Sequence, residues 1–199
     1  MTQTIADKIY LLLRERIVTG ELAADEKLRQ DHIAREFDAS HVPVREALLR
    51  LEAHGLATSI PRRGMRVSAL DPQEIREVVE MRVALEVLAL SHAVPRMREK
   101  DVTAIRTAFD ACDAATDMVT WDRANRAFHM ALLTPCAMPR LLDTIADLEL
   151  AAARHLFAHW RDTWKPRRDS DHAALVEAID RRDAAGACDV MRRHLRRVR

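Results

Sequence analysis

Glycine, aromatic residues and cysteine are all scarce in this sequence. Its 199 residues include four glycines and three cysteines, and aromatic side chains make up only 4%. Little glycine together with abundant Ala, Leu, Arg and Glu favours a helical protein with aliphatic cores. The odd number of cysteines and the lack of a CxxC pair exclude a disulfide scaffold and make cysteine an unsuitable metal ligand here.

Long apolar runs are also missing. No segment approaches the roughly 20 apolar residues that a membrane-spanning helix needs. Asp7 and Lys8 interrupt the N-terminal region, which therefore does not resemble a signal peptide. We expect a cytoplasmic protein with no membrane partner. The formal net charge is only +1, so composition alone does not indicate nucleic-acid binding.

The first seventy residues nevertheless show the element order of a winged helix-turn-helix. Apolar residues at helical spacing predict three helices, over residues 4–19, 30–37 and 42–54. Two short β-like pieces follow, over residues 56–60 and 65–68. Pro61, Arg62, Arg63 and Gly64 lie between them and predict a basic hairpin tip. Ser40 is the expected N-cap of the third helix.

This element order suits double-stranded DNA. The third helix is short enough to enter a major groove and offers polar side chains near its start, those of Ser40, His41 and Arg45. The hairpin tip places Arg62 and Arg63 where they can reach phosphates or the minor groove, and Gly64 permits close backbone approach. The competing interpretation is that these arginines are ordinary solvated surface charges.

From residue 71 onward the pattern is helical throughout. Asp71 and Pro72 have the features of a helix start, and Pro135, Pro139 and Pro166 mark breaks between helices. Six helices are predicted, over residues 72–95, 100–115, 120–133, 139–164, 170–181 and 184–198. The sequence therefore predicts a mainly α protein, with a winged helix-turn-helix domain over residues 1–70 and a six-helix α-bundle over residues 71–199.

Three histidines lie on the apolar stripes of three different predicted helices in this bundle. His129, His172 and His194 each share helical spacing with apolar neighbours, so each imidazole is expected on a buried face. A polar ring in a core costs free energy unless a partner satisfies it. Asn125 stands one turn before His129, so both can reach one ion. A shared metal ion is the first candidate partner, although any one histidine alone is more simply a hydrogen-bonded core residue.

Two sets of motifs resemble a known family. Residues 28–34 and 40–52, above all the Pro-Val-Arg-Glu-Ala-Leu word at 43–48, resemble GntR-type transcriptional regulators. Asn-Arg-Ala-Phe-His at 125–129, Asp-His at 171–172 and Met-Arg-Arg-His-Leu at 191–195 resemble the FadR-type C-terminal effector domain, called FCD. The short six-helix form looks like the VanR subgroup. Together these motifs span nearly the whole chain in the right order.

The resemblance implies a homodimeric, ligand-responsive repressor that binds an inverted-repeat operator. It also implies a divalent metal ion such as Zn or Ni in the bundle, with a small carboxylate effector against it. By position, the implied metal ligands are Asn125, His129, His172 and His194. The implied DNA contacts are Ser40, His41, Arg45 and Gly64, flanked by Arg62 and Arg63.

Two departures from the family pattern stand out. Many relatives have Arg where His41 stands, which puts base preference in question. Asn125 replaces a frequent Asp, and its neutral carbonyl removes one negative charge from the site. We therefore expect the metal to be held less firmly than in a site with Asp.

Arg82 has two interpretations. It lies on an inward stripe one turn before Glu86, so it can form an ion pair with that residue or hold the effector carboxylate beside the metal. Elsewhere, Trp121, Trp160 and Trp164 are expected in core or dimer packing. The terminal arginines are expected on the solvent face of the last helix.

The alternative function is a metal-dependent hydrolase, because three histidines with an open position also describe a catalytic zinc site. Against it, no carboxylate stands out as a general base. Asp171 adjoins His172 but is expected to point about a quarter turn away. The bundle also follows a DNA-binding domain, which an enzyme does not need. We therefore expect a protein that is not an enzyme.

Overall fold

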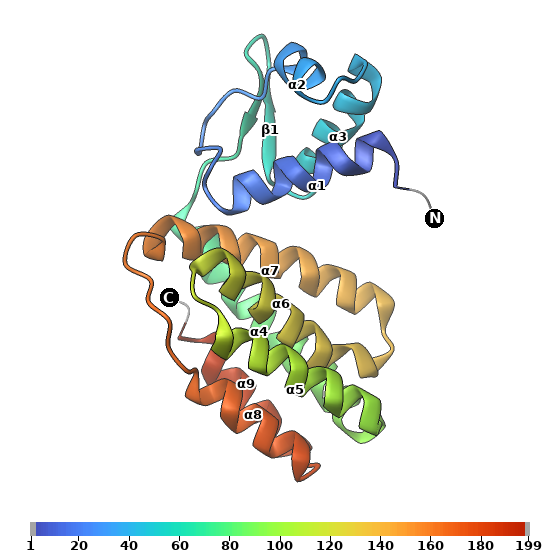
Figure 1. Ribbon diagram of the computed structural model, residues 1–199, viewed down its shortest axis with the longest axis vertical. Helices are drawn as coiled ribbons and strands as arrows, with labels where there is room; N and C mark the ends of the chain where they lie inside the picture. Colours follow the sequence, from blue (N-terminus) through green and yellow to red (C-terminus); the bar gives the residue numbers. More distant parts are fainter. Residues whose placement is uncertain (1–2, 198–199) are drawn as a thin grey trace. The chain divides into compact units, whose positions relative to one another are not determined.

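The computed structural model describes residues 3–197 and comprises two compact units, Met1–Asp71 and Pro72–Arg199. Among the described residues there are nine α-helices, two 3-10 turns and one two-stranded sheet (Figure 1). The prediction of a mainly α protein, with a winged helix-turn-helix followed by an α-bundle, is confirmed. No helix among residues 3–197 is both long and apolar enough to cross a membrane.

The first unit is built from three helices and a hairpin. Their bounds are α1 Ile5–Val18, α2 Gln30–Glu36, α3 His41–Ala53, β1 Ala57–Ile60 and β2 Gly64–Val67. The helices bury one apolar face each, and Ile9, Leu13 and Leu48 are among the most buried side chains of the shared core. Burying such a side chain contributes roughly 1.5–3 kcal/mol, so this core fixes α3 against α1 and α2.

The hairpin forms the wing. Strands β1 and β2 pair antiparallel, with Thr58 opposite Arg66. The chain reverses through Arg62, at φ 63°, and Gly64, at φ 78°. Arg62 therefore adopts a left-handed conformation that non-glycine residues rarely take, which sets the shape of the tip.

Two residues of the first unit, Ser40 and Arg50, make other contacts than the sequence indicates. Ser40 occupies the N-cap position of α3, but its hydroxyl makes no capping hydrogen bond. Arg50, which the sequence leaves ambiguous between DNA and solvent, donates to Asp7 at 2.7 Å and stacks over the Tyr10 ring at 4.2 Å. The Ser40 hydroxyl therefore makes no hydrogen bond to its own helix, whereas Arg50 links α3 to α1.

The second unit is a bundle of six α-helices. Their bounds are α4 Pro72–Ala93, α5 Glu99–Ala114, α6 Met118–Leu133, α7 Pro139–Trp160, α8 Ser170–Asp180 and α9 Ala184–Leu195. Helix α4 packs against α6, α7 and α9, while α5 packs on α6 and α8 on α9 (Figure 1). This arrangement brings α6, α8 and α9, which carry the three histidines, around one core.

Helix ends account for most differences from the predicted ranges. Helix α6 begins two residues earlier than predicted because the Asp117 carboxylate accepts a hydrogen bond from the Thr120 backbone N–H and caps the helix. Helix α7 ends at Trp160, and residues 161–169 form an irregular segment that leads to α8. Val198, which the predicted stripe of the last helix includes, lies outside the described residues.

Candidate functional site

The three histidines predicted to share a partner come together in the bundle. His129 is on α6, His172 on α8 and His194 on α9, and their side chains are 1%, 0% and 11% exposed. Ring centroids lie 4.7 Å apart for His172 and His194, 5.2 Å for His129 and His194, and 5.8 Å for His129 and His172. One nitrogen from each ring lies within 4.8 Å of the others.

Several ligand-type atoms of this cluster are buried without a hydrogen-bond partner among the described residues. They are Asn125 Oδ1, His129 Nε2 and both ring nitrogens of His172. Buried polar atoms are nearly always hydrogen-bonded, so several orphans in one place require an explanation. The donor set, neutral nitrogen plus one amide oxygen, fits a divalent ion of the Zn, Ni, Co, Fe or Mn group. The residues present therefore fit a metal.

Burial keeps these imidazoles in the form that binds metals. It lowers the pKa of His172 to about 4, with the nearby His129 acting in the same direction. Burial also places the pKa of His194 well below its usual range. Both rings are therefore neutral at neutral pH, and a neutral imidazole offers the lone pair that a metal ligand needs.

Glu86 on α4 orients His129, a role that the sequence alone did not reveal. Its Oε2 lies 2.8 Å from His129 Nδ1, and its Oε1 accepts from Arg82 Nε at 2.6 Å. Burial opposes ionisation of Glu86, but Arg82 and His129 together place its pKa below the usual range. With Nδ1 engaged by a carboxylate, His129 is left with Nε2 for a metal, an arrangement that fixes ring orientation and raises ligand basicity.

Glu149 on α7 lies next to Glu86, but its electrostatic surroundings differ. Burial, reinforced by the neighbouring Glu86 carboxylate, raises its pKa well above the usual value. One of its carboxyl oxygens, Oε1, has no hydrogen-bond partner among the described residues. The surroundings of Glu86 therefore favour its charged form, whereas those of Glu149 favour its neutral form.

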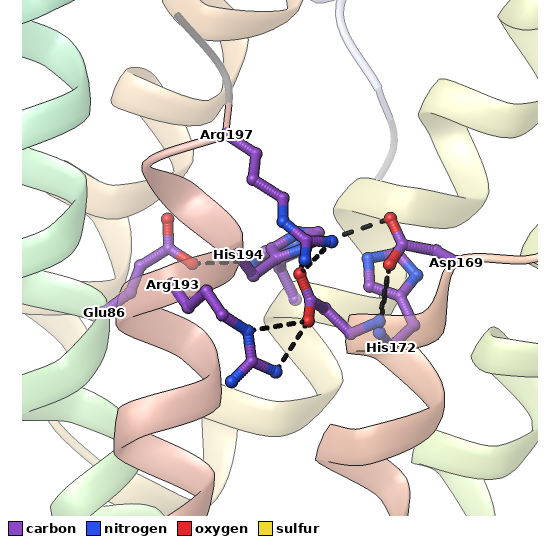
Figure 2. Close-up of polar contacts among 8 residues, drawn as sticks. Glu86, Asp169, His172, Arg193, His194 and Arg197 are labelled. Atoms are coloured by element: carbon purple, nitrogen blue, oxygen red, sulfur yellow. Dashed lines mark hydrogen bonds and ion pairs between the residues drawn. The ribbon is translucent and has the colours of Figure 1, made fainter.

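Two carboxylates lie on the other side of the cluster, although the sequence indicated no general base beside these ligands. Asp169 caps α8, accepting from the backbone N–H groups of Asp171 and His172, and its Oδ2 lies 3.9 Å from His194 Nδ1. Asp171 Oδ2 is also 3.9 Å from that nitrogen. In Figure 2, His194 lies between Glu86 on one side and Asp169 with His172 on the other. Asp171 was expected about a quarter turn away from His172, and the structure places its carboxylate close to His194 on the neighbouring helix.

Asp171 is held by the arginines at the end of α9. Arg193 donates to its Oδ1 at 2.7 Å, and Arg197 lies 2.6 Å from its Oδ2 (Figure 2). The Asp171 carboxylate is almost completely buried, so this double pairing is what makes its charge tolerable. Arg193 and Arg197 thus form ion pairs in addition to lying on the solvent face of the last helix. Because both Asp171 oxygens are paired with arginines, Asp171 is not free to act as a base.

A cavity of about 820 Å³ opens beside the histidines. Arg82, Asn125, His129 and His194 contribute to its wall, and so do all three tryptophans. Trp160 is 53% exposed and is therefore not a core residue of this unit, whereas the alternative expectation of dimer packing stays a prediction. Arg82 pairs with Glu86, as the first of its two interpretations predicts, and it also lines the cavity. That it holds an effector carboxylate stays a prediction.

The residues proposed to contact DNA all lie on the surface of the first unit. Ser40, His41 and Arg45 are exposed at the start of α3, and Arg62, Arg63 and Gly64 are exposed at the hairpin tip. His41 Nδ1 lies 3.8 Å from Asp31 Oδ1. Val42, which lies between His41 and Arg45 on α3, is 76% exposed. An apolar side chain among polar ones at a helix start suits contact with base edges, where thymine presents a methyl group.

Comparison with known proteins agrees with this division. Residues 5–67 match the model for bacterial regulatory proteins of the gntR family, and residues 77–197 match the FCD domain. The chain is 33% identical to the HTH-type transcriptional repressor GlaR of Escherichia coli (strain K12), over 98% of this chain and 94% of that protein. It is 26% identical to the HTH-type transcriptional repressor RspR of the same strain, over 99% and 88%.

The solved structure of E. coli McbR/YncC shows the same fold. Its TM-score is 0.86 at 22% sequence identity, covering 100% of this chain and 98% of that one. The predicted GntR and FCD resemblance is confirmed. The metal-dependent hydrolase, kept as an alternative, is not supported, because both domains are those of transcriptional regulators rather than enzymes. The chain belongs to the gntR family of bacterial transcriptional regulators and carries an FCD domain.

Proposed function

We propose that this regulator is a repressor that binds operator DNA as a homodimer and releases it in response to a small organic acid. The acid would bind at a divalent metal ion held by Asn125, His129, His172 and His194. The observation that carries the proposal is the group of buried ligand atoms without partners, gathered beside a cavity. A metal would satisfy those atoms and offer an open position to a carboxylate.

The chain's own residues divide the work around that ion. Glu86 holds His129 through Nδ1, and the Asp169 cap fixes the start of α8 beside His172. Arg82 lines the cavity next to these ligands and provides a guanidinium for a carboxylate. Asn125 adds no charge, so an anionic effector would complete the charge balance of the site.

DNA binding in this proposal uses α3 and the wing. Arg45 and the arginines of the hairpin tip supply positive charge, and two copies of α3 in a dimer would enter successive major grooves of an inverted repeat. Met81 and Leu88 are exposed apolar residues two turns apart on α4, which provides surface for a subunit contact. The effector controls DNA binding only if it favours one arrangement of the dimer over another.

The direct test is a gel shift with the protein's own upstream DNA, with metal and after chelation, across a panel of carboxylic acids. We expect specific binding to one inverted repeat and release of that DNA by at least one acid. The acids that release DNA should also raise the melting temperature, since a ligand stabilises the state it binds. Acids that raise the melting temperature without changing operator binding would contradict the proposed control.

Glu86→Gln tests the orientation of His129. The amide keeps the size of the side chain but loses the charge that supports both His129 and Arg82. We expect metal affinity to fall roughly 10- to 100-fold, the usual effect of removing such a supporting partner. Competition with a chromophoric chelator measures the change. Glu77→Gln, an exposed glutamate on the same helix, is the matched control and should leave affinity unchanged.

A further inference from the structure

Every tryptophan of the chain lines the cavity beside the histidines. Trp121 lies on α6, Trp160 ends α7 and Trp164 belongs to the segment that follows. The Trp121 and Trp164 rings have centroids 6.1 Å apart and planes inclined by 46°. Only 4% of the residues are aromatic, so this concentration at one wall is a specific feature of the cavity rather than a general property of the core.

The cavity is large for an acyclic acid. Its volume of about 820 Å³ falls in the range of roughly 300–1,000 Å³ that holds drug-sized ligands. A two- to six-carbon acid bound at the histidines would fill only a small part of this volume. The size therefore favours a ligand with a body that extends from the metal ligands to the tryptophans.

The charge of the wall favours an anion. Among the residues that line the cavity, Asp169 is the only carboxylate. The lining lysine and arginine side chains outnumber it and are Arg82, Lys165, Arg167, Arg168 and Arg197. Three of them already have carboxylate partners, in Glu86, Asp113 and Asp171. Lys165 and Arg167 form no ion pair within residues 3–197, so their charges remain available to a ligand.

We infer that the effector is an aromatic carboxylate, whose ring packs against Trp121 and Trp164 while its carboxylate faces the histidine cluster and Arg82. The inference rests on the proposed function for the position of the carboxylate. Aromatic pairs in offset or tilted arrangements contribute beyond the area they bury. Residues 161–169 supply much of this wall, including Trp164, Lys165 and Arg167, so the specificity is encoded largely by one connecting segment.

Matched acids separate aromaticity from size and charge. Isothermal titration calorimetry of the zinc-loaded, two-unit chain would compare 2-naphthoate with decahydronaphthalene-2-carboxylate, and benzoate with cyclohexanecarboxylate. We expect the aromatic member of each pair to bind roughly two- to tenfold more tightly and succinate to bind more weakly than 2-naphthoate. Equal or tighter binding of the saturated acids would overturn the inference, as would binding of none of these acids.

Variants locate the preference. Trp121→Leu and Trp164→Leu keep an apolar wall and should remove most of the difference between 2-naphthoate and its saturated partner. Lys165→Ala should weaken both acids severalfold, more at low salt than at high salt, whereas the control Lys100→Ala on α5 should not. A preference that survives in both leucine variants would contradict the assignment.

Metal content and operator binding, measured on the same samples, keep the two proposals apart. Tight, tryptophan-dependent binding of 2-naphthoate with no effect on operator affinity would support the ligand class and count against the proposed regulation. Zinc retention together with operator release by an acyclic acid alone would support the proposed regulation and count against the aromatic ligand class.

Discussion

Replacing both His172 and His194 with alanine is expected to abolish metal retention and the effector response together. The substitution removes two of four proposed ligands, and the remaining Asn125 and His129 cannot hold a first-row metal firmly with one amide oxygen and one imidazole. Elemental analysis after gel filtration should find stoichiometric metal in the wild type and none in the variant. Operator binding should persist but no longer respond to any acid.

Loss of packing is the competing explanation for such a result. The His172 ring lies 4.5 Å from that of Phe128, so alanine there leaves a void that costs stability. Asn125→Asp provides a test that misfolding cannot mimic, because it adds a negative charge and should raise metal affinity. Metal bound equally by the wild type and the double variant would show that the histidines are not ligands. An unchanged affinity in Asn125→Asp would remove Asn125 from the proposed ligands.

Arg45→Ala should produce the second large effect, the loss of specific operator binding. Arg45 is exposed one turn into α3 and forms no ion pair within residues 3–197, so its guanidinium is available to a base edge or phosphate. A bidentate contact to guanine is worth roughly 1–3 kcal/mol of discrimination, or about five- to 150-fold in affinity. Fluorescence anisotropy with operator and scrambled DNA should show that the specific complex weakens more than the nonspecific one.

A charge-matched control distinguishes base reading from general electrostatics. Lys8→Ala removes one exposed cation from α1 and should reduce binding to both DNAs slightly and equally, if at all. If Arg45→Ala also weakens both equally, Arg45 contacts only the backbone. Unchanged binding would remove Arg45 from the DNA-binding surface. The melting temperature of Arg45→Ala should match that of the wild type, because the Arg45 side chain contributes nothing to the core.

The histidine cluster was predictable because helical periodicity determines which side chains face inward. His129, His172 and His194 each share an apolar stripe, and three stripes in a six-helix bundle converge on one core. Helical periodicity shows which face of a helix is buried, but not which residues of another helix that face contacts. Glu86 also lies on an inward stripe, yet its pairing with His129 depends on how α4 crosses α6, and no local pattern encodes that.

The end of α7 was harder to interpret. The helix was predicted to run through Trp164 but ends at Trp160, so the sequence did not place Trp164 or Lys165 in the irregular segment that lines the cavity. Asp171 illustrates a related failure. Its angular position on α8 was estimated from an ideal helix, but it lies in the first turn, where the Asp169 cap and the arginines of α9 determine its surroundings. Tertiary contacts at helix ends override helical geometry.

The distribution of aromatic residues has a practical consequence for spectroscopy. All three tryptophans belong to the second unit, whereas the single tyrosine, Tyr10, is buried in the first. Tryptophan emission from the unlabelled protein therefore reports only on the second unit. Its unfolding can be followed in the whole chain without an added label and without signal from the first unit.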